Sequence, residues 1–245
     1  MNEHYFYIAE TTSTNVLMKE MLQSEALPHG FVVHAGFQSA GRGQGSNTWE
    51  SAKDKNLLFS LLLRPQQIDA SEFFLVSQMV SLGILYVLRA QTDDENSKHF
   101  SIKWPNDIYW KNQKIGGILI ENTLQGRSIQ TSICGIGLNI NQDVFTSDAP
   151  NPISLLQIMG RTFEIKQLLQ EVRSCILKIC QFTPDDIRQK YMLHLYRNTG
   201  YHPFKTSNFT FYARVIQIES DGKLILEDTE KQRLTFYFKE VEFVL

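Results

Sequence analysis

Hydrophobic residues recur along the first two hundred positions with a spacing that alternates between helical and extended. After Thr12 and Ser13, either of which could cap a helix, the apolar residues of 17–22 fall on one helical face. The nearly continuous apolar run at 57–63 has the length of a buried strand, and the strongly hydrophobic stretch at 71–91 that of the principal helix. Further strands are predicted at 31–35, 101–104, 108–110, 116–121 and 128–141, and further helices at 165–179 and 184–195.

The pattern changes after Gly200, where the predicted strands become short. They cover 209–218, 224–226 and 234–238, and turn signals separate them at 221–222 and 228–230. We therefore predict an α+β fold, in which residues 1–198 form a mixed β-sheet packed with helices and residues 199–245 form a small β-barrel. Such a barrel is too small to enclose a deep active site of its own.

Composition narrows the class of protein. A chain of 245 residues with 42% hydrophobic and 20% charged residues can bury a substantial core, so we expect a folded globular protein. The formal charge of -2, with no run of Lys and Arg, argues against a dedicated nucleic-acid binder. No stretch approaches the ~18 apolar residues of a membrane span, so no membrane partner is expected.

The spacing of cysteines and histidines indicates whether disulfides or a structural metal site are expected. The three cysteines are an odd number without Cys-x-x-Cys spacing, which is typical of reduced thiols. The first residues lack the basic and apolar segments of a signal peptide, so a cytoplasmic location is expected. The six histidines are scattered, and a structural zinc site is not expected.

A glycine-dense loop, 41–49, is the first candidate for chemistry. It places Arg42 among three glycines and ends at Trp49. Backbone N–H groups freed by glycine can approach anionic oxygens, Arg42 can clamp a carboxylate or phosphate, and the indole of Trp49 can cover a planar ring. A surface loop with a chance arginine is an equally consistent interpretation.

Lys103-Trp104-Pro105-Asn106-Asp107 is the second candidate. Pro105 prevents a helical continuation and fixes a turn that presents Asn106 and Asp107. By composition alone, a plain turn in which Asp107 caps its own backbone is the simpler interpretation. The functional alternative is that Asp107 holds Mg²⁺ together with phosphate oxygens.

Two further candidates involve glycines in predicted strands. Lys114 precedes Gly116 and Gly117, and over a closed pocket its ammonium would offset charge on a transferring phosphoryl group. A solvated hairpin lysine is the commoner case. The glycines of 135–141 suggest close approach by a ligand or by another backbone, although a kinked strand would look the same.

The order and combination of these motifs resemble the biotin-protein ligase family. The resemblance covers about residues 10–141 and continues more loosely to the C-terminus. It rests on Ser13-Thr14-Asn15, on Gln38 with Gly41-Arg42-Gly43 and Trp49, on Lys103 to Asp107, on Lys114 to Gly117, and on Gly135 to Asn141.

The resemblance implies both a fold and an activity. The family has a class II synthetase-like catalytic domain with a mixed sheet, followed by a small SH3-like barrel. Its members join biotin and ATP into biotinyl-5'-AMP with release of pyrophosphate. They then transfer biotin to a lysine of a biotin carboxyl carrier protein domain. No protein nucleophile is required, since the biotin carboxylate attacks the α-phosphate.

Family roles carry over onto matching residues of this sequence. The resemblance implies Lys114, Arg42 and Asp107 as the catalytic groups, with Mg²⁺ on Asp107 as the cofactor. The residues implied to bind biotin are Ser13, Thr14, Asn15, Gln38, Arg42, Gly43, Gln44 and Lys114. Those implied to bind the nucleotide are Trp49, Asn106, Gly117 and Asn139.

Two departures from the family are visible. Many members carry further arginines between Arg42 and the tryptophan, where this chain reads Gln44-Gly45-Ser46-Asn47, so weak retention of the adenylate is expected. Some relatives carry an N-terminal helix-turn-helix domain. Here about ten residues precede the first motif, so a monofunctional ligase without DNA binding is expected.

Two alternatives stay open. A lipoate-protein ligase has a similar fold and also passes through an acyl-adenylate, but the Arg42 loop and the run 103–107 favour biotin. A non-enzymatic biotin sensor is the alternative from another class, and the presence of both Lys114 and Asp107 argues against it. The sequence does not decide whether the protein forms a homodimer.

Overall fold

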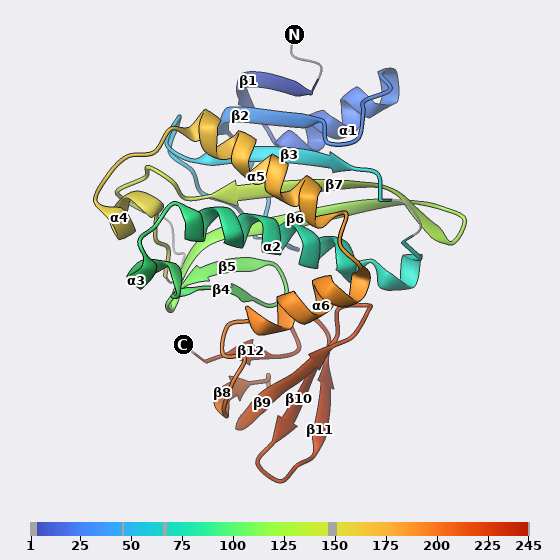
Figure 1. Cartoon of the computed structure of the whole chain (residues 1–245), viewed down its shortest axis with the longest axis vertical. Helices are drawn as coiled ribbons and strands as arrows, with labels where there is room; N and C mark the ends of the chain where they lie inside the picture. The colour runs from blue at the N-terminus through green and yellow to red at the C-terminus, as the bar shows by residue number, and fades with distance from the viewer. Residues whose placement is uncertain (1–3, 46, 66–67, 147–150, 245) are drawn as a thin grey trace.

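The computed structural model describes residues 4–45, 47–65, 68–146 and 151–244, and it contains two β-sheets (Figure 1). The larger sheet has the strand order β1-β2-β3-β7-β6-β5-β4. Its strands are β1 (Tyr5–Thr11), β2 (Val32–Gln38), β3 (Leu57–Leu63), β4 (Phe100–Lys103), β5 (Asp107–Trp110), β6 (Gln113–Gln125) and β7 (Ser128–Leu138). Only β1 and β2 among its described pairs run parallel, so the sheet is mixed.

Helices cover both faces of this sheet. They are α1 (Thr14–Ser24), α2 (Phe74–Ala90), α3 (Asp94–Ser97), α4 (Leu155–Met159), α5 (Ile165–Ile179) and α6 (Pro184–Leu193). Alternation along β3 separates the faces, because Leu61 and Leu63 pack into the main core whereas Leu62 packs with Met18 of α1. Helix α2 therefore lies on one face, beside α5 and α6, and α1 lies on the other.

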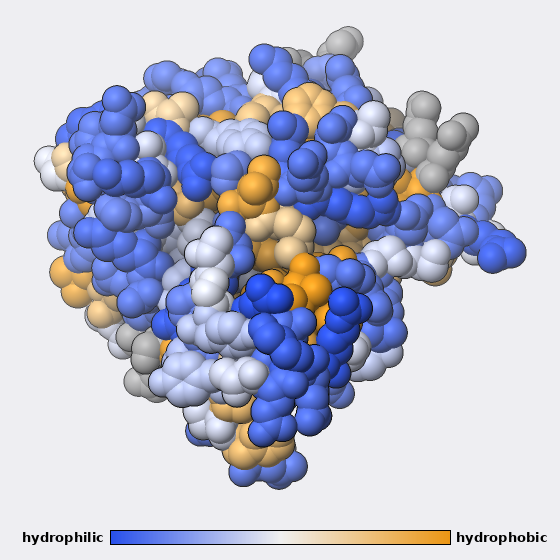
Figure 2. All heavy atoms as spheres, turned by 60° about the horizontal axis from the view of Figure 1, so that its bottom comes forward, coloured by the Kyte–Doolittle hydropathy of each residue, from blue (hydrophilic) through white to orange (hydrophobic). Residues whose placement is uncertain are grey.

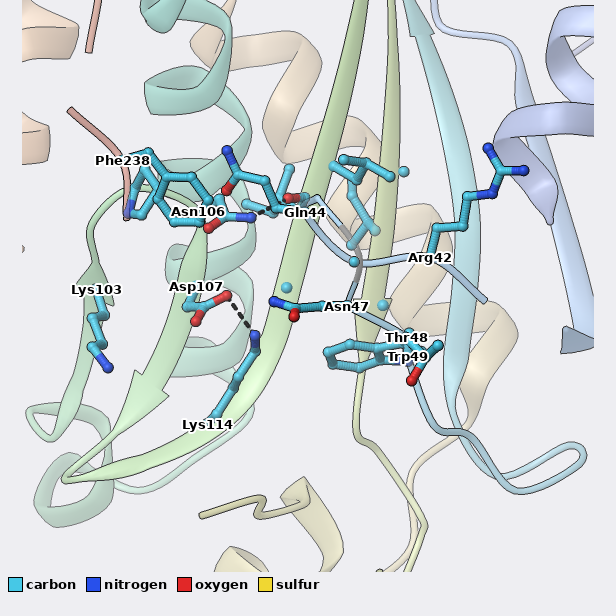
Figure 3. Close-up of a pocket in the computed structure, with 18 of the residues that line it drawn as sticks. Arg42, Gln44, Asn47, Thr48, Trp49, Lys103, Asn106, Asp107, Lys114 and Phe238 are labelled. Carbon is cyan, nitrogen blue, oxygen red and sulfur yellow. Dashed lines mark hydrogen bonds and ion pairs between the residues drawn. The ribbon is translucent and has the colours of Figure 1, made fainter. Parts of the chain in front are cut away.

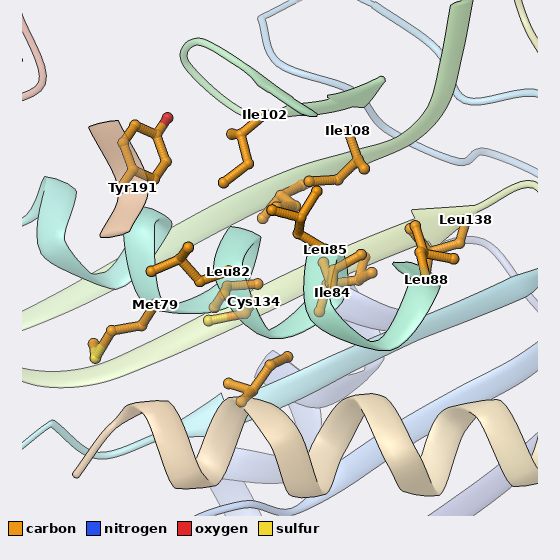
Figure 4. Close-up of a cluster of buried hydrophobic side chains, with 14 of the residues drawn as sticks. Met79, Leu82, Ile84, Leu85, Leu88, Ile102, Ile108, Cys134, Leu138 and Tyr191 are labelled. Carbon is orange, nitrogen blue, oxygen red and sulfur yellow. The ribbon is translucent and has the colours of Figure 1, made fainter. Parts of the chain in front are cut away.

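The main core forms around α2, which is buried on nearly every side. Figure 4 shows its side chains Met79, Leu82, Ile84, Leu85 and Leu88 between the sheet and the neighbouring helices. A helix that is apolar all round can only be accommodated in such an interior position. This explains why 71–91 is the most hydrophobic helical segment of the sequence.

A second sheet follows α6 and forms a C-terminal domain. Its strands are β8 (His202–Lys205), β9 (Thr210–Ile218), β10 (Leu224–Asp228), β11 (Arg233–Phe236) and β12 (Glu242–Phe243), in the order β11-β10-β9-β8-β12. Trp104 donates its indole N–H to the Gly222 carbonyl oxygen over 2.8 Å, which ties this domain to the turn between β4 and β5. The predicted α+β fold with a C-terminal β-domain is confirmed. The boundary at 198/199 stays a prediction.

Some local predictions differ from the structure. Residues 70–72 form a 3-10 turn and α2 begins at Phe74, because the Asp69 carboxylate accepts the N–H of Ser71 and caps that turn instead of the helix. Strands β1, β8 and β12 and the short helices α3 and α4 were not predicted. No described helix is long and apolar enough to cross a membrane. The face that carries the C-terminal domain is largely hydrophilic, with hydrophobic side chains in small groups (Figure 2).

Candidate active site

A cavity of about 720 Å³ lies on the α1 face of the sheet and gathers most of the predicted site residues. It is bounded by the start of α1, the loop 41–49, the turn between β4 and β5, strands β6 and β7, and the last turn and strand of the C-terminal domain (Figure 3). All the predicted site residues except Asn139 line it: Ser13, Thr14, Asn15, Gln38, Arg42, Gly43, Gln44, Trp49, Asn106, Asp107, Lys114 and Gly117.

One end of the cavity is a buried polar cluster at the start of α1. Ser13 stands at the N-cap position but makes no capping bond with its side chain, so its hydroxyl remains available to the cavity. The Gln38 side-chain oxygen accepts the N–H of Thr14 over 2.7 Å. Ser60 lies 2.8 Å from the Thr14 hydroxyl and 2.6 Å from the Asn15 side-chain oxygen. Hydroxyls and amides held in this way suit a small polar ring.

Lys114 and Asp107 form an ion pair in the middle of the cavity, with Nζ and Oδ1 2.6 Å apart. Their side chains are 34% and 21% exposed, so the pair is partly desolvated and still reachable by a ligand. The two residues sit on adjacent strands, and a bulge after Ile108 shifts the register so that Tyr109 faces Lys114. In Figure 3 the two side chains point toward each other.

Lys103 adds a second cation to the same wall. Its Nζ donates to the Tyr109 hydroxyl over 3.0 Å and lies 4.6 Å from the centre of that ring. Burial lowers the pKa of Lys103, and the Asp107 carboxylate opposes that shift. Burial also raises the pKa of Tyr109, so this hydroxyl stays protonated at neutral pH.

Asn106 is fixed by the strand beside it. The side-chain N–H of Asn106 donates to the Ile118 carbonyl oxygen over 2.7 Å, and the backbone carbonyl of Asn106 accepts the Ile118 N–H over 2.9 Å. The preceding Trp104–Pro105 peptide bond is cis. The turn predicted at Lys103–Asp107 is confirmed, because residues 104–106 form a turn between β4 and β5. Asp107 follows this turn directly and pairs with Lys114.

The loop 41–49 folds back on itself as a narrow hairpin. Gly43 N–H donates to the Asn47 carbonyl over 2.7 Å, and Trp49 N–H donates to the Gly41 carbonyl over 3.0 Å. Arg42 is exposed, and in Figure 3 its guanidinium points away from Lys114 and Asp107. Ser46, part of the departure from the family pattern, lies outside the described residues.

Trp49 fills the floor of the cavity. A Cβ atom added at Gly137 would lie 2.6 Å from the indole, and one added at Gly117 would lie 3.2 Å from it. The group that approaches Gly137 is thus a side chain of this protein, whereas the sequence suggested a ligand, another backbone or a plain kink at the glycines of 135–141. The same indole also lies against Gly117. The indole N–H of Trp49 is buried without a hydrogen-bond partner among the described residues.

Asn139 lies outside the cavity lining. It is buried at 3% exposure, and its side-chain N–H donates to the Ile153 carbonyl over 3.2 Å. Its backbone carbonyl also accepts the Leu155 N–H over 3.0 Å, so Asn139 holds the segment 153–155 and is not among the residues that line the cavity.

Sequence reasoning missed residues from distant parts of the chain that either line the cavity or hold a residue that lines it. Ser60 and Glu121 hold Asn15, and neither belongs to a recognisable motif. The C-terminal domain contributes one wall of the cavity with Phe238, Lys239, Val241, Glu242 and Phe243. No local pattern marks these residues, since only the docking of the second sheet brings them to the cavity.

Comparisons with known proteins agree with this geometry. The model of the biotin/lipoate A/B protein ligase family matches residues 6–139. Bifunctional ligase/repressor BirA of Bacillus spizizenii is 31% identical, over 94% of this chain and 71% of that protein. Biotin–protein ligase 2 of Arabidopsis thaliana is 33% identical, over 56% of this chain and 44% of that protein.

A solved structure shares the whole fold. Biotin protein ligase from Aquifex aeolicus, in complex with biotin and ATP, superimposes with a TM-score of 0.77 over 98% of this chain and 99% of that one, at 21% identity. The family match over more than half of the chain and the similarity to the Bacillus protein lead to one assignment. This chain belongs to the biotin/lipoate A/B protein ligase family.

Proposed function

We propose that this protein is a biotin–protein ligase. It activates biotin with ATP to biotinyl-5'-AMP and transfers biotin to a lysine of a biotin carboxyl carrier protein domain. The observation that carries the proposal is the single cavity that joins the polar cluster at Thr14, Asn15 and Gln38 to the Lys114–Asp107 pair. The names of the similar Bacillus and Arabidopsis proteins support it.

In the first step two anions must meet. A carboxylate oxygen of biotin forms a bond to the α-phosphorus of ATP, the bond to the bridging oxygen of the β-phosphate breaks, and pyrophosphate leaves. The Lys114 ammonium offsets the repulsion between carboxylate and phosphate, and Asp107 holds it in position. Ser13, Thr14, Asn15 and Gln38 orient biotin, while Gly43 and Gln44 of the loop close over it.

In the second step the carrier lysine attacks the activated carbonyl. An amide bond forms, the bond between the carbonyl carbon and the phosphate oxygen breaks so that AMP leaves, and the attacking amine releases a proton to water. Asp107 is placed to accept a hydrogen bond from that amine, because its carboxylate faces the cavity at 21% exposure. We assign Trp49, Asn106 and Gly117, which line the cavity, to the nucleotide, and Arg42, which lines the same cavity from the loop 41–49, to the phosphate of the adenylate.

The cavity also suits a magnesium ion. The carboxylates among its lining residues are Asp107 and Glu242. The described residues contain no group of three or more His, Cys, Asp or Glu that could hold a metal alone. Mg²⁺ commonly uses one or two carboxylates and takes its other ligands from phosphate oxygens and water. Asp107 would hold it, and the ion would neutralise phosphate charge.

An exchange assay tests the proposed function. Biotin-dependent exchange between ATP and labelled pyrophosphate should occur in the unmodified protein, and Lys114→Ala should lower its rate about 10²- to 10³-fold. Lys111→Ala is the control, because Lys111 is exposed on the neighbouring turn and stacks on Trp110 outside the cavity. Circular dichroism should show the same fold in both variants.

The same assay separates the alternatives. Exchange driven by lipoate or octanoate and not by biotin would make the protein a lipoate-type ligase. Biotin binding without any exchange would make it a sensor. Labelling of a carrier domain with biotin tests the transfer step. The cytoplasmic location, the absence of DNA binding and the expected weak retention of the adenylate stay predictions.

A further inference from the structure

We propose that Lys239 of the C-terminal domain binds the phosphates of ATP that leave as pyrophosphate. This inference rests on the proposed function, because it assigns one more residue to the same cavity. It concerns the wall opposite the loop 41–49, where the sequence motifs place no cation.

Lys239 reaches across the cavity mouth to that loop. It lies between β11 and β12 and lines the cavity together with Arg42 and Lys114. A Cβ atom added at Gly45 would lie 2.6 Å from Lys239 Nζ. The ammonium therefore sits directly against the loop backbone, and a ligand enclosed by the loop would meet it.

Among the residues that the structure describes, the Lys239 ammonium has no anionic partner and makes no hydrogen bond or ion pair. It lies 5.8 Å from the centre of the Phe238 ring. The other lysines of the cavity are engaged, since Lys114 pairs with Asp107 and Lys103 donates to Tyr109. An uncompensated ammonium at the mouth of a cavity attracts an anion, and lysine binds phosphate as a point charge.

The backbone conformation at Lys239 also supports a role for its side chain. Its φ of +70° lies in the left-handed region, which glycine adopts without strain and other residues rarely do. Glu240 closes this turn, because its carboxylate accepts the Tyr237 N–H over 2.7 Å and its own N–H donates to the Tyr237 carbonyl. A glycine would complete the turn more easily, so what the lysine contributes is its side chain.

The position selects the leaving phosphates. The α-phosphate must meet the biotin carboxylate at Lys114, which is partly buried, whereas Lys239 is exposed and lies beside the exposed Gly45. The β- and γ-phosphates extend away from the reacting atom and carry most of the negative charge of ATP. They are the anions that Lys239 can reach from the C-terminal domain.

The test compares glycine and arginine at this position. Lys239→Gly should raise the KM for ATP and the inhibition constant for pyrophosphate about tenfold, because a charge-assisted hydrogen bond at an exposed site is lost. The KM for biotin should change less than twofold, and the melting temperature should not fall, because glycine relieves the left-handed conformation. Lys239→Arg should keep the KM for ATP within about threefold of the unmodified protein.

Lys231→Gly is the matched control. Lys231 belongs to the same domain and has a φ of +68°, but it pairs with Glu227 and Tyr201 outside the cavity. It should leave both KM values unchanged. An unaltered KM for ATP in Lys239→Gly, or an increase confined to the KM for the carrier domain, would overturn the inference. Absence of biotin-dependent exchange in the unmodified protein would instead refute the proposed function itself.

Discussion

Asn15 shows how the polar end of the cavity is assembled from single contacts. The residue is 4% exposed, and its side-chain N–H groups donate to Glu121 Oε2 over 3.0 Å and to the Leu119 carbonyl over 3.3 Å. Its side-chain oxygen lies 2.6 Å from Ser60, and a Cβ atom added at Gly135 would collide with the amide. Both ends of the amide are therefore matched to fixed partners, and its orientation is set before any ligand binds.

Replacing this amide with a carboxylate tests that arrangement. Asn15→Asp removes the donors and places a negative charge beside Glu121, so we expect a loss of about 2–3 kcal/mol of unfolding free energy at pH 7. We also expect a higher KM for biotin. Urea denaturation and exchange kinetics measure the two effects.

A second substitution identifies the cause. In Asn15→Asp combined with Glu121→Gln, the new amide can donate to the new carboxylate, so part of the lost stability should return. The prediction fails if Glu121→Gln has the same effect in both backgrounds.

Residues of the site were predictable where they share a motif and unpredictable where they do not. Asp107 and Lys114 are seven positions apart on one hairpin, so the spacing along the sequence is enough to predict that their side chains lie close together. Ser60 and Glu121 come from strands whose register is decided by the whole sheet. Lys239 depends on the docking of a second domain, which no local pattern encodes.

At the scale of elements, His194 joins α6 to the edge strand β4. It caps the C-terminal end of α6, and its carbonyl accepts the Ile102 N–H over 2.8 Å. Its ring packs edge-on against Tyr86 and lies 3.2 Å from an Arg89 nitrogen. Burial, followed by the charges of Arg89 and Lys190, lowers the pKa of His194 to about 4.

This shift predicts a loss of stability in acid. The folded state keeps His194 neutral, whereas His194 of the unfolded chain takes up a proton near pH 6.5. The free energy of unfolding is therefore unaffected by His194 above pH 6.5 and decreases as the pH falls from 6.5 toward 4. Because His194 is partly exposed, solvent screening reduces the loss to about 1–2 kcal/mol. Urea denaturation at pH 7.5 and pH 4.5 measures it.

His194→Gln provides the comparison, because glutamine can still accept a hydrogen bond from Arg89 but does not titrate. The lowered pKa values of His29 and His34 affect both proteins equally, so the difference between the two isolates His194. Identical pH dependence in the two proteins would contradict the prediction.

Elements with strong periodicity were predicted and weakly patterned ones were not. Helices α2 and α5 and strand β3 carry enough buried apolar residues for their spacing to show. In α1 the partly buried Leu17, Met21 and Leu22 flank the buried Met18 and make the apolar face visible. Strand β1 is an edge strand without a fully buried residue, and β12 has only two residues. Such strands exist because a neighbour offers hydrogen bonds, which the pattern of a single segment does not reveal.

At the scale of the molecule, the two sheets share one continuous core. Residues of the C-terminal domain such as Phe204, Leu224 and Phe243 pack in the same cluster as the α2 side chains. The tip of the turn between β9 and β10 docks on α2, where Phe74 N–H donates to the Ser220 carbonyl. The change in sequence pattern near residue 200 therefore marks a change of architecture around one shared core.

The contact at Gly222 tests how far this docking controls the active site. Gly222 has a φ of +84°, and a Cβ atom there would lie 2.7 Å from the Phe74 ring. Gly126 has a similar φ of +62° but has no atom within 4 Å of its added Cβ. Gly126→Ala should therefore cost about 1 kcal/mol from backbone strain alone. Gly222→Ala adds a collision inside a packed interface, for a total of about 2–4 kcal/mol.

The two variants should also differ in catalysis. Displacing the turn at Gly222 moves the domain that carries Phe238, Lys239 and Glu242, so the KM for ATP should rise in Gly222→Ala and stay constant in Gly126→Ala. Unfolding followed by tryptophan fluorescence and by circular dichroism should give coincident transitions in the unmodified protein, because Trp104 lies at the domain junction. Equal stability and equal KM values in the two glycine variants would mean that the C-terminal domain forms its wall of the cavity independently of this contact.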